Sequence, residues 1–454
     1  MTLENRQVLV DLMGRLDRTD LPVEELKSLA ALLRESGTFH FPILENGLYP
    51  AAAIRADNEY TGYGNVWVRD NVQIAHARQI AGDGSFSGLT AQSLMRHFTS
   101  QRPRFQGIID GTLDASDPAN RPHVRFDGLG MRDLPERWPH AQNDALGYFL
   151  WFYCRLVHTG VVVPTQSGWQ TLGLFPRYFE TIRFWEDEDS GHWEEERKVS
   201  ASSIGVVLGG LLELKRMAAA LPPDQRGGVT GGDGLLERLL HKGRGTLDAI
   251  LPHESRHPAE KARRYDSALL FLIHPVGVVP PAGPQADCII RDVGAHLQGE
   301  IGIRRYLGDS FWAPDYKKKL EAGKRTVDWS DGLETRNRLA VAGAEAQWCI
   351  FDPILSSIHG LRYRLRGDRE DLVAQMRHLG RSLRQLTGPD GRFPPLRCPE
   401  LYYLEERTWQ PNDVTPLLWT QANLLAALKG MEASLETPAP SGESVDGSEK
   451  GACR

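Results

Sequence analysis

Long apolar runs, an excess of positive charge and regularly spaced cysteines are all missing from this 454-residue chain. No stretch reaches the roughly 18 consecutive apolar residues of a membrane-spanning helix, so we expect no membrane partner. Lys and Arg number 53 against 59 Asp and Glu, and the net charge of −6 argues against a nucleic-acid partner. The content of 41% hydrophobic residues is typical of a globular protein with a large core.

The cysteines and the N-terminus indicate a compartment. The five cysteines are odd in number and contain no CxxC pair, which argues against a disulfide framework and against a cysteine-based zinc site. Residues 1–25 mix charges into their apolar positions, so they predict a short amphipathic helix and not the uninterrupted apolar core of a signal peptide. We therefore expect a cytoplasmic protein in a reducing environment.

Helical periodicity dominates the rest of the chain. Apolar residues recur at three- and four-residue spacing in the segments 204–220, 339–361, 372–386 and 416–431. The alternation that marks half-buried strands is almost absent. The Pro- and Gly-rich segments 221–234 and 274–287 predict loops between helices. The sequence therefore predicts an all-α fold.

The composition predicts one domain. No shift in composition divides residues 26–436, so we expect a single domain there, after the N-terminal helix at 1–25. Residues 437–454 have the low hydrophobicity of a disordered tail. We expect the chemistry to lie in the loops that join the helices of the domain.

One metal-binding pattern occurs, in a context that argues against a metal site. His253, Glu254 and His257 match the HExxH spacing, which binds zinc only when a helix places both histidines on one face. Pro252 and Pro258 flank the pattern, and a residue that precedes a proline disfavours the helical conformation. The sequence therefore predicts a loop here, and we expect neither a metal ion nor another cofactor.

Four clusters combine aromatic rings with carboxylates or planar donors, which is a combination that binds sugars. The first cluster contains Tyr63, Trp67, Arg69 and Asp70. Its rings offer stacking faces, and Arg69 with Asp70 offers oriented hydrogen bonds to neighbouring hydroxyls. An alternative interpretation is that Arg69 and Asp70 form an ion pair with a structural role only.

The next two clusters follow further along the chain. The second contains Trp138, Gln142 and Asp144, of which Asp144 equally suits the N-terminus of a helix. The third places Glu186 directly after Trp185. An apolar neighbour raises the pKa of a carboxyl by desolvation, so Glu186 is a candidate general acid. The other acidic residues around it are explained by a solvated surface.

The fourth cluster places Glu400 beside a proline and two tyrosines, upstream of the helix predicted at 416–431. Its alternative interpretation is a surface glutamate. Glu186 and Glu400 are thus two candidate carboxyls, far apart in the chain, in a sequence that also offers aromatic and Arg/Asp sugar contacts. These are the residue types that form the active site of a glycosidase.

The clusters, in this order, resemble the catalytic domain of glycoside hydrolase family 15, the glucoamylase family. They resemble still more the glucoamylase-like domains of the phosphorylase kinase alpha and beta subunits. The resemblance covers about residues 40 to 432. It rests on five collinear motifs, which are WVRDN (67–71), QNDALGYFLW (142–151), WED (185–187) with SASSIG (200–205), GIRRYLGD (302–309), and PELYY (399–403) with PLLW (416–419).

The resemblance implies a fold and a set of site residues. The implied fold is an (α/α)6 toroid of six outer and six inner helices, with the active site at the end where the inner helices begin. Glu186 falls on the general acid of the family and Glu400 on its general base, while Arg69 and Asp70 fall on the pair that binds the terminal glucose. The remaining substrate-binding positions implied in this way are Tyr63, Trp138 and Arg305.

The function expected from the residues and the resemblance together is that of an exo-acting α-glucosidase. It would hydrolyse short α-glucans from the non-reducing end with inversion of the anomeric centre. Two alternatives stay open. One is a non-catalytic or regulatory glucan-binding domain of the kinase-subunit kind, and the other is a hydrolase for another α-glucoside, such as trehalose or an isomalto-oligosaccharide. The sequence leaves the oligomeric state open as well.

Overall fold

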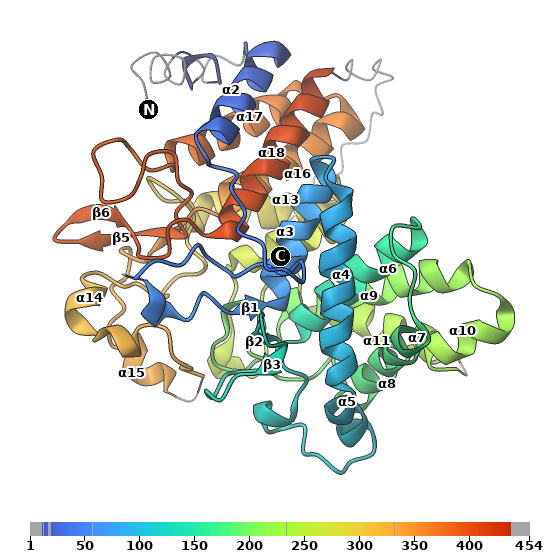
Figure 1. Ribbon diagram of the computed structural model, residues 1–454. Coiled ribbons are helices and arrows are strands. Elements are labelled where there is room, and N and C mark those ends of the chain that lie inside the picture. The colour runs from blue at the N-terminus through green and yellow to red at the C-terminus, as the bar shows by residue number, and fades with distance from the viewer. Residues whose placement is uncertain are drawn as a thin grey trace. The chain divides into compact units, whose positions relative to one another are not determined.

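The computed structural model describes residues 11, 13–16, 20–56, 58–232, 234–330 and 332–436. Helices form most of the described chain and its strands are short, so the predicted all-α class is confirmed (Figure 1). Contacts group the chain into two compact units. Unit 1 comprises Met1–Phe41, Tyr265–Tyr316 and Ala340–Arg454, and unit 2 comprises Pro42–Arg264 and Lys317–Leu339. The single domain expected over residues 26–436 stays a prediction.

Two expectations concern the chain ends. The tail expected at 437–454 lies outside the described residues, as does most of the helix expected at 1–25. The helix α2 (Val23–Glu35) begins near the end of that N-terminal range. Both expectations therefore stay predictions.

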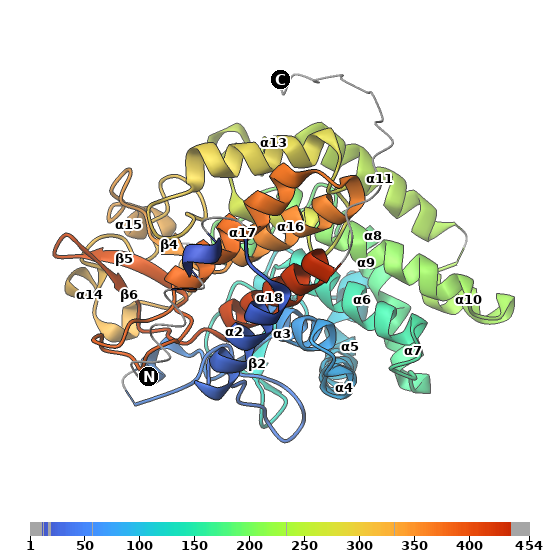
Figure 2. The same ribbon diagram turned by 90° about the horizontal axis from the view of Figure 1, so that it is seen from above.

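Unit 2 is built mainly from helices that pack in pairs. These helices are α3 (Val68–Ile80), α4 (Gly84–Ser100), α5 (Arg102–Ile109), α6 (Asn143–His158), α7 (Gln166–Leu172), α8 (Leu174–Thr181), α9 (Ala201–Ala219), α10 (Pro223–Thr230), α11 (Leu235–Ile250) and α15 (Leu333–Asn337). Figures 1 and 2 show α3 beside α4 and α6 beside α9. The N-termini of α3 and α6 hold the polar residues of the first two sequence clusters.

A small antiparallel sheet precedes these helix starts. It consists of β1 (Val66–Trp67), β2 (Arg125–Asp127) and β3 (Arg132–Asp133). Trp67 pairs with Arg125 across the first two strands. Residues that are directly opposite in an antiparallel pair lie on the same face of the sheet. The register therefore sets the side chain of Arg125 against that of Trp67.

Two glycines allow α6 and α9 to approach closely. A Cβ atom at Gly147 would lie 2.7 Å from the backbone nitrogen of Val207, and one at Gly210 would lie 2.8 Å from the carbonyl oxygen of Gly147. Any larger residue at either position would force the helices apart, because backbone atoms cannot move aside. This close packing fixes the start of α6, where Gln142 and Asp144 lie.

Unit 1 has a leucine-rich core shared by α2, α17 (Arg369–Arg384) and α18 (Leu418–Glu436). The buried leucines of this core include Leu26, Leu29, Leu33, Leu379, Leu383, Leu424 and Leu428. The helix α16 (Phe351–Arg366) packs on α17 and α18. The unit also contains α12 (Leu270–Ile273), α13 (Pro284–Asp292) and a sheet of β4 (Gln347–Trp348), β5 (Leu401–Glu405) and β6 (Thr408–Pro411).

Three of the four long helices predicted from periodicity are confirmed, since α9, α17 and α18 cover most of the predicted segments. The helix predicted over 339–361 is wrong in its first half. α16 begins only at Phe351, because Gly343 adopts a left-handed conformation with φ 82° and Gln347–Trp348 pairs with β5 as a strand. Strand pairing here overrides the helical spacing of the apolar residues.

The two predicted loops are partly helical. The segment 221–234 contains α10, which has Pro223 in its first turn and Gly231, with φ 82°, at its C-terminal cap. The segment 274–287 runs into α13, which begins at Pro284. Proline is tolerated at the start of a helix and glycine is favoured just past its end. The residues that indicated breaks therefore mark helix termini.

The cysteines differ from expectation at one position. Cys154, Cys349 and Cys398 are free and buried. Cys288 is disulfide-bonded, which the number and spacing of the cysteines did not predict. The expectation of a chain without disulfides therefore does not hold at Cys288.

The HESRH segment serves the fold of unit 2. Glu254 is buried, and its carboxylate accepts hydrogen bonds from the backbone N–H of Ser202 at 3.1 Å and from the hydroxyl of Ser202 at 2.6 Å. A carboxylate in this position caps the N-terminus of α9. The segment itself contains bends, a bridge between Ser255 and Arg263, and no helix, so the predicted loop is confirmed. Within the described residues, no group of three His, Cys, Asp or Glu side chains is arranged to hold a metal ion.

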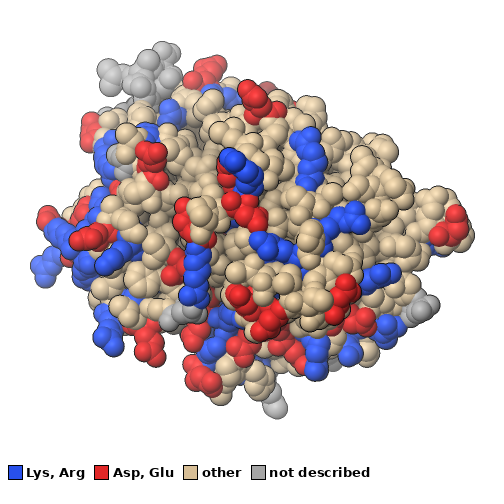
Figure 3. Space-filling model, turned by 60° about the horizontal axis from the view of Figure 1, so that its bottom comes forward, with Lys and Arg blue, Asp and Glu red and all other residues tan. Residues whose placement is uncertain are grey.

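The described helices and the surface agree with the composition. None of these helices is both long and apolar enough to cross a membrane. Figure 3 shows Lys and Arg interspersed with Asp and Glu over the face that it displays. This mixture is the pattern expected from a net charge of only −6.

Candidate active site

The polar core of unit 2 forms where α3 and α6 begin. Arg69 and Asp70 lie in the first turn of α3, Gln142 is the N-cap residue of α6, and Asp144 lies in the first turn of α6. Arg69 Nη1 contacts Asp144 Oδ2 at 2.5 Å and donates to Gln142 Oε1 at 3.2 Å. The structure therefore brings together four of the residues predicted for the site.

Arg69 also contacts a carboxylate that the sequence analysis did not single out. Glu194 Oε1 lies 3.3 Å from Arg69 Nη2 and accepts a hydrogen bond of 2.8 Å from the indole N–H of Trp67. Its side chain is 19% exposed, so Glu194 is only partly buried. Burial raises the pKa of the Glu194 carboxyl, while Arg69 opposes that shift. Such a carboxyl retains its proton to higher pH, as a general acid requires.

The backbone at Glu194 is strained. The residue follows the short 3-10 helix Gly191–Trp193 and adopts a left-handed conformation with φ 56°. A side chain other than glycine rarely adopts this conformation, and residues held in it cluster at functional sites. The turn directs Glu194 toward Arg69 and Trp67.

Glu186 has a different environment. Its side chain is 55% exposed and contacts Arg183 Nη2 at 2.5 Å, and it accepts a hydrogen bond of 3.1 Å from the indole of Trp185. The desolvation by Trp185 that the sequence analysis expected is therefore absent. Both contacts are local in the sequence, and the structure does not bring Glu186 to Arg69. The next residue, Asp187, is held by Arg121 in a two-point contact of 2.8 and 2.9 Å.

Buried carboxylates lie close to Arg69 and attract its positive charge. Asp144 is fully buried between Arg69 and His192, whose Nδ1 lies 3.6 Å from Asp144 Oδ2. Burial raises the pKa of Asp70 to about 7, against the opposing effect of Arg69. Burial, together with the nearby charge of Asp144, likewise raises the pKa of Asp189 to about 7. Asp144 thus holds Arg69 in place, and the ion pair expected between Arg69 and Asp70 is replaced by one between Arg69 and Asp144.

Three aromatic rings predicted for the site lie together. The rings of Tyr63 and Trp67 are 5.3 Å apart, and those of Trp67 and Trp138 are 5.8 Å apart and nearly perpendicular. The guanidinium of Arg125 lies 4.1 Å from the Trp138 ring and 4.9 Å from the Trp67 ring. Arg125 was not predicted, because only the pairing of β1 with β2 brings it to these rings.

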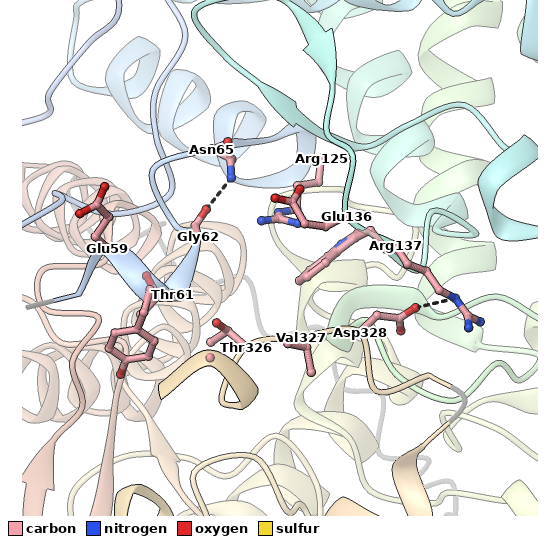
Figure 4. Close-up of a pocket in the computed structure, with 13 residues that line it drawn as sticks. Glu59, Thr61, Gly62, Asn65, Arg125, Glu136, Arg137, Thr326, Val327 and Asp328 are labelled. Carbon is pink, nitrogen blue, oxygen red and sulfur yellow. Dashed lines mark hydrogen bonds and ion pairs between the residues drawn. The ribbon is translucent and has the colours of Figure 1, made fainter. Parts of the chain in front are cut away.

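A cavity of about 630 Å³ borders this aromatic group (Figure 4). We call it the Trp138 pocket, and its lining residues are Glu59, Tyr60, Thr61, Gly62, Asn65, Arg125, Glu136, Arg137, Trp138, Gly323, Thr326, Val327 and Asp328. Figure 4 shows Arg125 and Glu136 across the pocket from Thr326 and Val327. A Cβ atom at Gly62, which has φ 71°, would lie 2.7 Å from Arg125 Nη2. Glycine at this position therefore leaves room for the guanidinium.

The remaining predicted residues lie in unit 1. Glu400 directly precedes β5 and is 1% exposed, and the side-chain amide of Asn412 donates to its carboxylate. Arg305 donates to both carboxylate oxygens of Asp309 at 2.7 Å and lies 4.9 Å from the Trp348 ring. The interpretation of Glu400 as a surface glutamate is therefore wrong. Both residues are buried and rigidly held within their unit.

Solved structures similar to this chain define its fold class. The match to one glycosidase covers 90% of this chain and 99% of that glycosidase, with a TM-score of 0.65 and 19% identity. The glucoamylase of Hormoconis resinae covers 93% of this chain and 77% of its own (TM-score 0.59, 11% identity). The match to a bacterial glucoamylase complexed with acarbose covers 86% of this chain and 53% of that glucoamylase, with a TM-score of 0.55 and 13% identity. The chain therefore has the (α/α)6 fold of glucoamylase-type glycosidases.

Two curated proteins are similar in sequence. The isomaltose glucohydrolase of Kribbella flavida is 25% identical over 303 residues, which are 65% of this chain and 74% of that protein. A probable phosphorylase b kinase regulatory subunit alpha of Caenorhabditis elegans is 25% identical over 315 residues. That match takes in 63% of this chain and about a quarter (24%) of the length of the kinase subunit. No protein-family model matches the chain. The resemblance to glucoamylase-like domains is confirmed.

Glu194 carries a sequence signal that could have identified it. Trp193, Glu194 and Glu195 repeat the order of tryptophan, glutamate and acidic residue found at Trp185–Asp187. Of the two copies, this one lies directly upstream of SASSIG (200–205). Glu195 is fully buried against Lys198 at 3.1 Å and Arg263 at 2.7 Å, so the second acidic residue of the motif has a structural role.

Proposed function

We propose that this protein is an inverting, exo-acting α-glucosidase in which Glu194, and not Glu186, is the general acid. The observation that carries the proposal is the environment of Glu194. Its side chain is partly buried at 19% exposed, burial raises the pKa of its carboxyl, and Trp67 and Arg69 orient that carboxyl. Glu186 has an exposed side chain and lacks these features.

The proposed reaction needs two carboxyls and a water molecule. Glu194 gives its proton to the glycosidic oxygen as the bond to the anomeric carbon breaks. Glu400 removes a proton from a water molecule that attacks the opposite face of that carbon, so a single displacement inverts the configuration. Inverting glycosidases in general hold their two carboxyl groups about 6.5 to 9.5 Å apart, which leaves room for the water.

Arg69, Asp70 and the rings are proposed to bind the terminal glucose. Directional donors and acceptors next to aromatic faces suit a sugar with many hydroxyls. Arg305 is proposed as a further contact with the sugar. Trp185 is no longer proposed as a sugar contact, because it adjoins Glu186, which is no longer the proposed general acid. A cytoplasmic location stays a prediction, as does the absence of a required metal or cofactor.

The natural substrate is proposed to be a short α-glucoside. The similarity to an isomaltose glucohydrolase makes isomaltose the first compound to test, followed by maltose and trehalose. Purified protein should release glucose from at least one of them, and NMR should show β-glucose as the first product. Release of α-glucose first would contradict the inverting mechanism.

The second candidate function is glucan binding without hydrolysis. The similarity to a kinase regulatory subunit is the observation that favours it. Calorimetry separates the two candidates. Saturable binding of maltose or isomaltose with no glucose released over a long incubation would support the binding domain. Any catalytic turnover that depends on Glu194 would exclude it.

A further inference from the structure

Tyr148 and His192 form a buried contact near the proposed general acid. The hydroxyl of Tyr148 lies 3.1 Å from His192 Nε2, which is within hydrogen-bonding distance. The side chain of His192 is 0% exposed, and Tyr148 is enclosed to the same degree. His192 belongs to the 3-10 helix Gly191–Trp193, directly upstream of Glu194. The chemistry proposed for the two carboxyls uses neither residue.

The turn that carries Glu194 needs an anchor, because its backbone is strained. Glu194 has φ 56°, and a residue other than glycine keeps this conformation only where its surroundings hold it. The hydrogen bond from its own backbone N–H to the carbonyl of Gly191 is long, at 3.3 Å. His192 precedes Glu194 by two residues and contacts Tyr148 on α6. That contact helps to hold the turn against α6.

One face of α6 positions both partners of the contact between Glu194 and Arg69. Asp144 and Tyr148 are four residues apart on this helix, so their side chains lie on the same face. Asp144 contacts Arg69 at 2.5 Å. Tyr148 contacts His192 and, through it, the turn at Glu194. The 3.3 Å contact between Arg69 and Glu194 therefore depends on two neighbouring side chains of one helix.

The imidazole of His192 is neutral near pH 7, which suits it to this position. Burial lowers the pKa of His192 to about 4, and Asp144 opposes that shift. Arg69 and Lys198 add to the effect of burial. The ring lies beside Asp144, with Nδ1 3.6 Å from Oδ2. A neutral ring there does not compete with Arg69 for the charge of the carboxylate.

We propose that Tyr148 and His192 are positioning residues for the proposed general acid: their hydrogen bond ties the turn that carries Glu194 to the helix that holds Arg69. The proposal rests on the proposed function and deepens it, because it identifies what sets the geometry of the acid. Both residues act through Glu194 and need no contact with the sugar.

The test compares two substrates that differ only in the leaving group. Isomaltose needs a proton on its leaving oxygen, whereas the fluoride of α-glucosyl fluoride needs little. His192→Leu and Tyr148→Phe each remove one side of the hydrogen bond and keep most of the apolar packing. A displaced acid should lower kcat for isomaltose about 10- to 10²-fold and change kcat for α-glucosyl fluoride much less. The ratio of the two kcat values should therefore fall.

An unchanged ratio, or an equal fall of kcat on both substrates, overturns the proposal. If His192→Leu fails to fold, Tyr148→Phe decides, because it removes only a hydroxyl. His192→Gln provides the rescue. Its side-chain amide reaches the position of Nε2 and can hydrogen-bond to Tyr148, so it should restore most of the ratio.

His97→Leu is the matched control for the loss of a buried histidine. His97 lies in unit 2, burial lowers its pKa to about 4, and its ring hydrogen-bonds to the carbonyl of His123. Its replacement should destabilise the protein, as His192→Leu does, and leave the ratio of kcat values unchanged. The same fall of the ratio in His97→Leu would assign the effect to lost stability and overturn the proposal.

Crystal structures of the variants test the geometry without any activity. The contact between Arg69 Nη2 and Glu194 Oε1 is 3.3 Å in the wild-type protein. It should be lost in His192→Leu and kept in His192→Gln. An unchanged contact in His192→Leu overturns the proposal.

Glu194→Gln separates this proposal from the proposed function. If Glu194→Gln keeps its kcat on isomaltose, the assignment of the acid fails, and the crystal structures still decide whether the pair holds the turn. If Glu194→Gln loses kcat on isomaltose while His192→Leu and Tyr148→Phe keep the wild-type ratio, only the positioning role is overturned.

Discussion

Two tryptophan–glutamate segments only eight residues apart have opposite environments in this protein. At Trp185–Glu186 the carboxyl is 55% exposed and paired with Arg183, which is itself 63% exposed. At Trp193–Glu194 the glutamate side chain is 19% exposed and contacts Arg69, which is only 4% exposed. The order of residues is the same, so it does not determine which glutamate is buried.

The difference arises from which tryptophan touches the carboxyl and what lies around it. Trp185 packs near the charged end of Lys242, at 4.3 Å, so its surroundings are partly polar. Glu194 instead accepts a hydrogen bond from Trp67, which comes from a distant part of the chain. The comparison teaches that a neighbour in sequence desolvates a carboxyl less effectively than elements that converge on it in the fold.

The largest expected effect concerns the proposed base, which shares the burial of Glu194. Glu400→Gln should lower kcat about 10²- to 10⁴-fold with a smaller change in KM, because general base catalysis contributes that much. Glu405→Gln is the matched control, since Glu405 lies on β5 and is only partly buried. It should stay within a few-fold of wild type. Steady-state kinetics on isomaltose measures both, and equal activity of the two variants would remove Glu400 from the mechanism.

Breaking the buried ion pair should destabilise the protein more than breaking the exposed one. Asp144→Asn removes one partner of a buried pair and leaves Arg69 poorly compensated, so it should lower the free energy of unfolding by about 3–5 kcal/mol. Arg183→Ala breaks the exposed pair with Glu186 and should change that free energy by less than about 1 kcal/mol. Urea denaturation of both variants measures the difference. Similar losses in the two variants would contradict the contrast in burial.

A pH-dependent effect of a few kcal/mol or less is expected from Asp189. Its pKa is about 7 in the folded protein and about 3.9 when unfolded, so between these values the folded state retains a proton that the unfolded state releases. The free energy of unfolding should therefore fall as pH rises from about 4 to 7. Asp189→Asn should reduce this fall by an amount on the order of a few kcal/mol, although Asp70 would maintain part of it.

Urea midpoints of wild type and Asp189→Asn at pH 4, 5.5 and 7 test this expectation. The carboxylate oxygen of Asp189 accepts a hydrogen bond of 2.9 Å from the backbone N–H of Asn143, and the side-chain oxygen of asparagine can still accept it. A destabilised variant with an unchanged pH slope would contradict the assigned pKa of Asp189.

Much of the fold was predictable because it rests on local periodicity. The apolar spacing located α9, α17 and α18, and the clusters of aromatic rings with carboxylates or planar donors located Arg69, Asp70, Gln142 and Asp144. The helix predicted over 339–361 failed in its first half because Gln347–Trp348 pairs with a strand more than fifty residues away. Pairing between distant segments overrides local propensity and leaves little trace in a single segment.

The site was less predictable than the fold for the same reason. Glu194 could be found only by weighing two copies of one pattern, and the copy chosen first has an exposed glutamate. Arg125 carries no motif at all, since its position depends on the register of β1 with β2. Side chains that converge from distant parts of the chain define this site, and single-sequence patterns do not encode that convergence.

The assignment of Glu194 as the general acid is tested most directly by changing how much the leaving group needs a proton. Isomaltose needs protonation of its leaving oxygen, whereas the fluoride of α-glucosyl fluoride needs little. For Glu194→Gln we predict a fall in kcat of about 10²- to 10⁴-fold on isomaltose and a much smaller one on α-glucosyl fluoride, with Glu186→Gln close to wild type on both. The account is contradicted if Glu186→Gln shows that selective loss and Glu194→Gln does not.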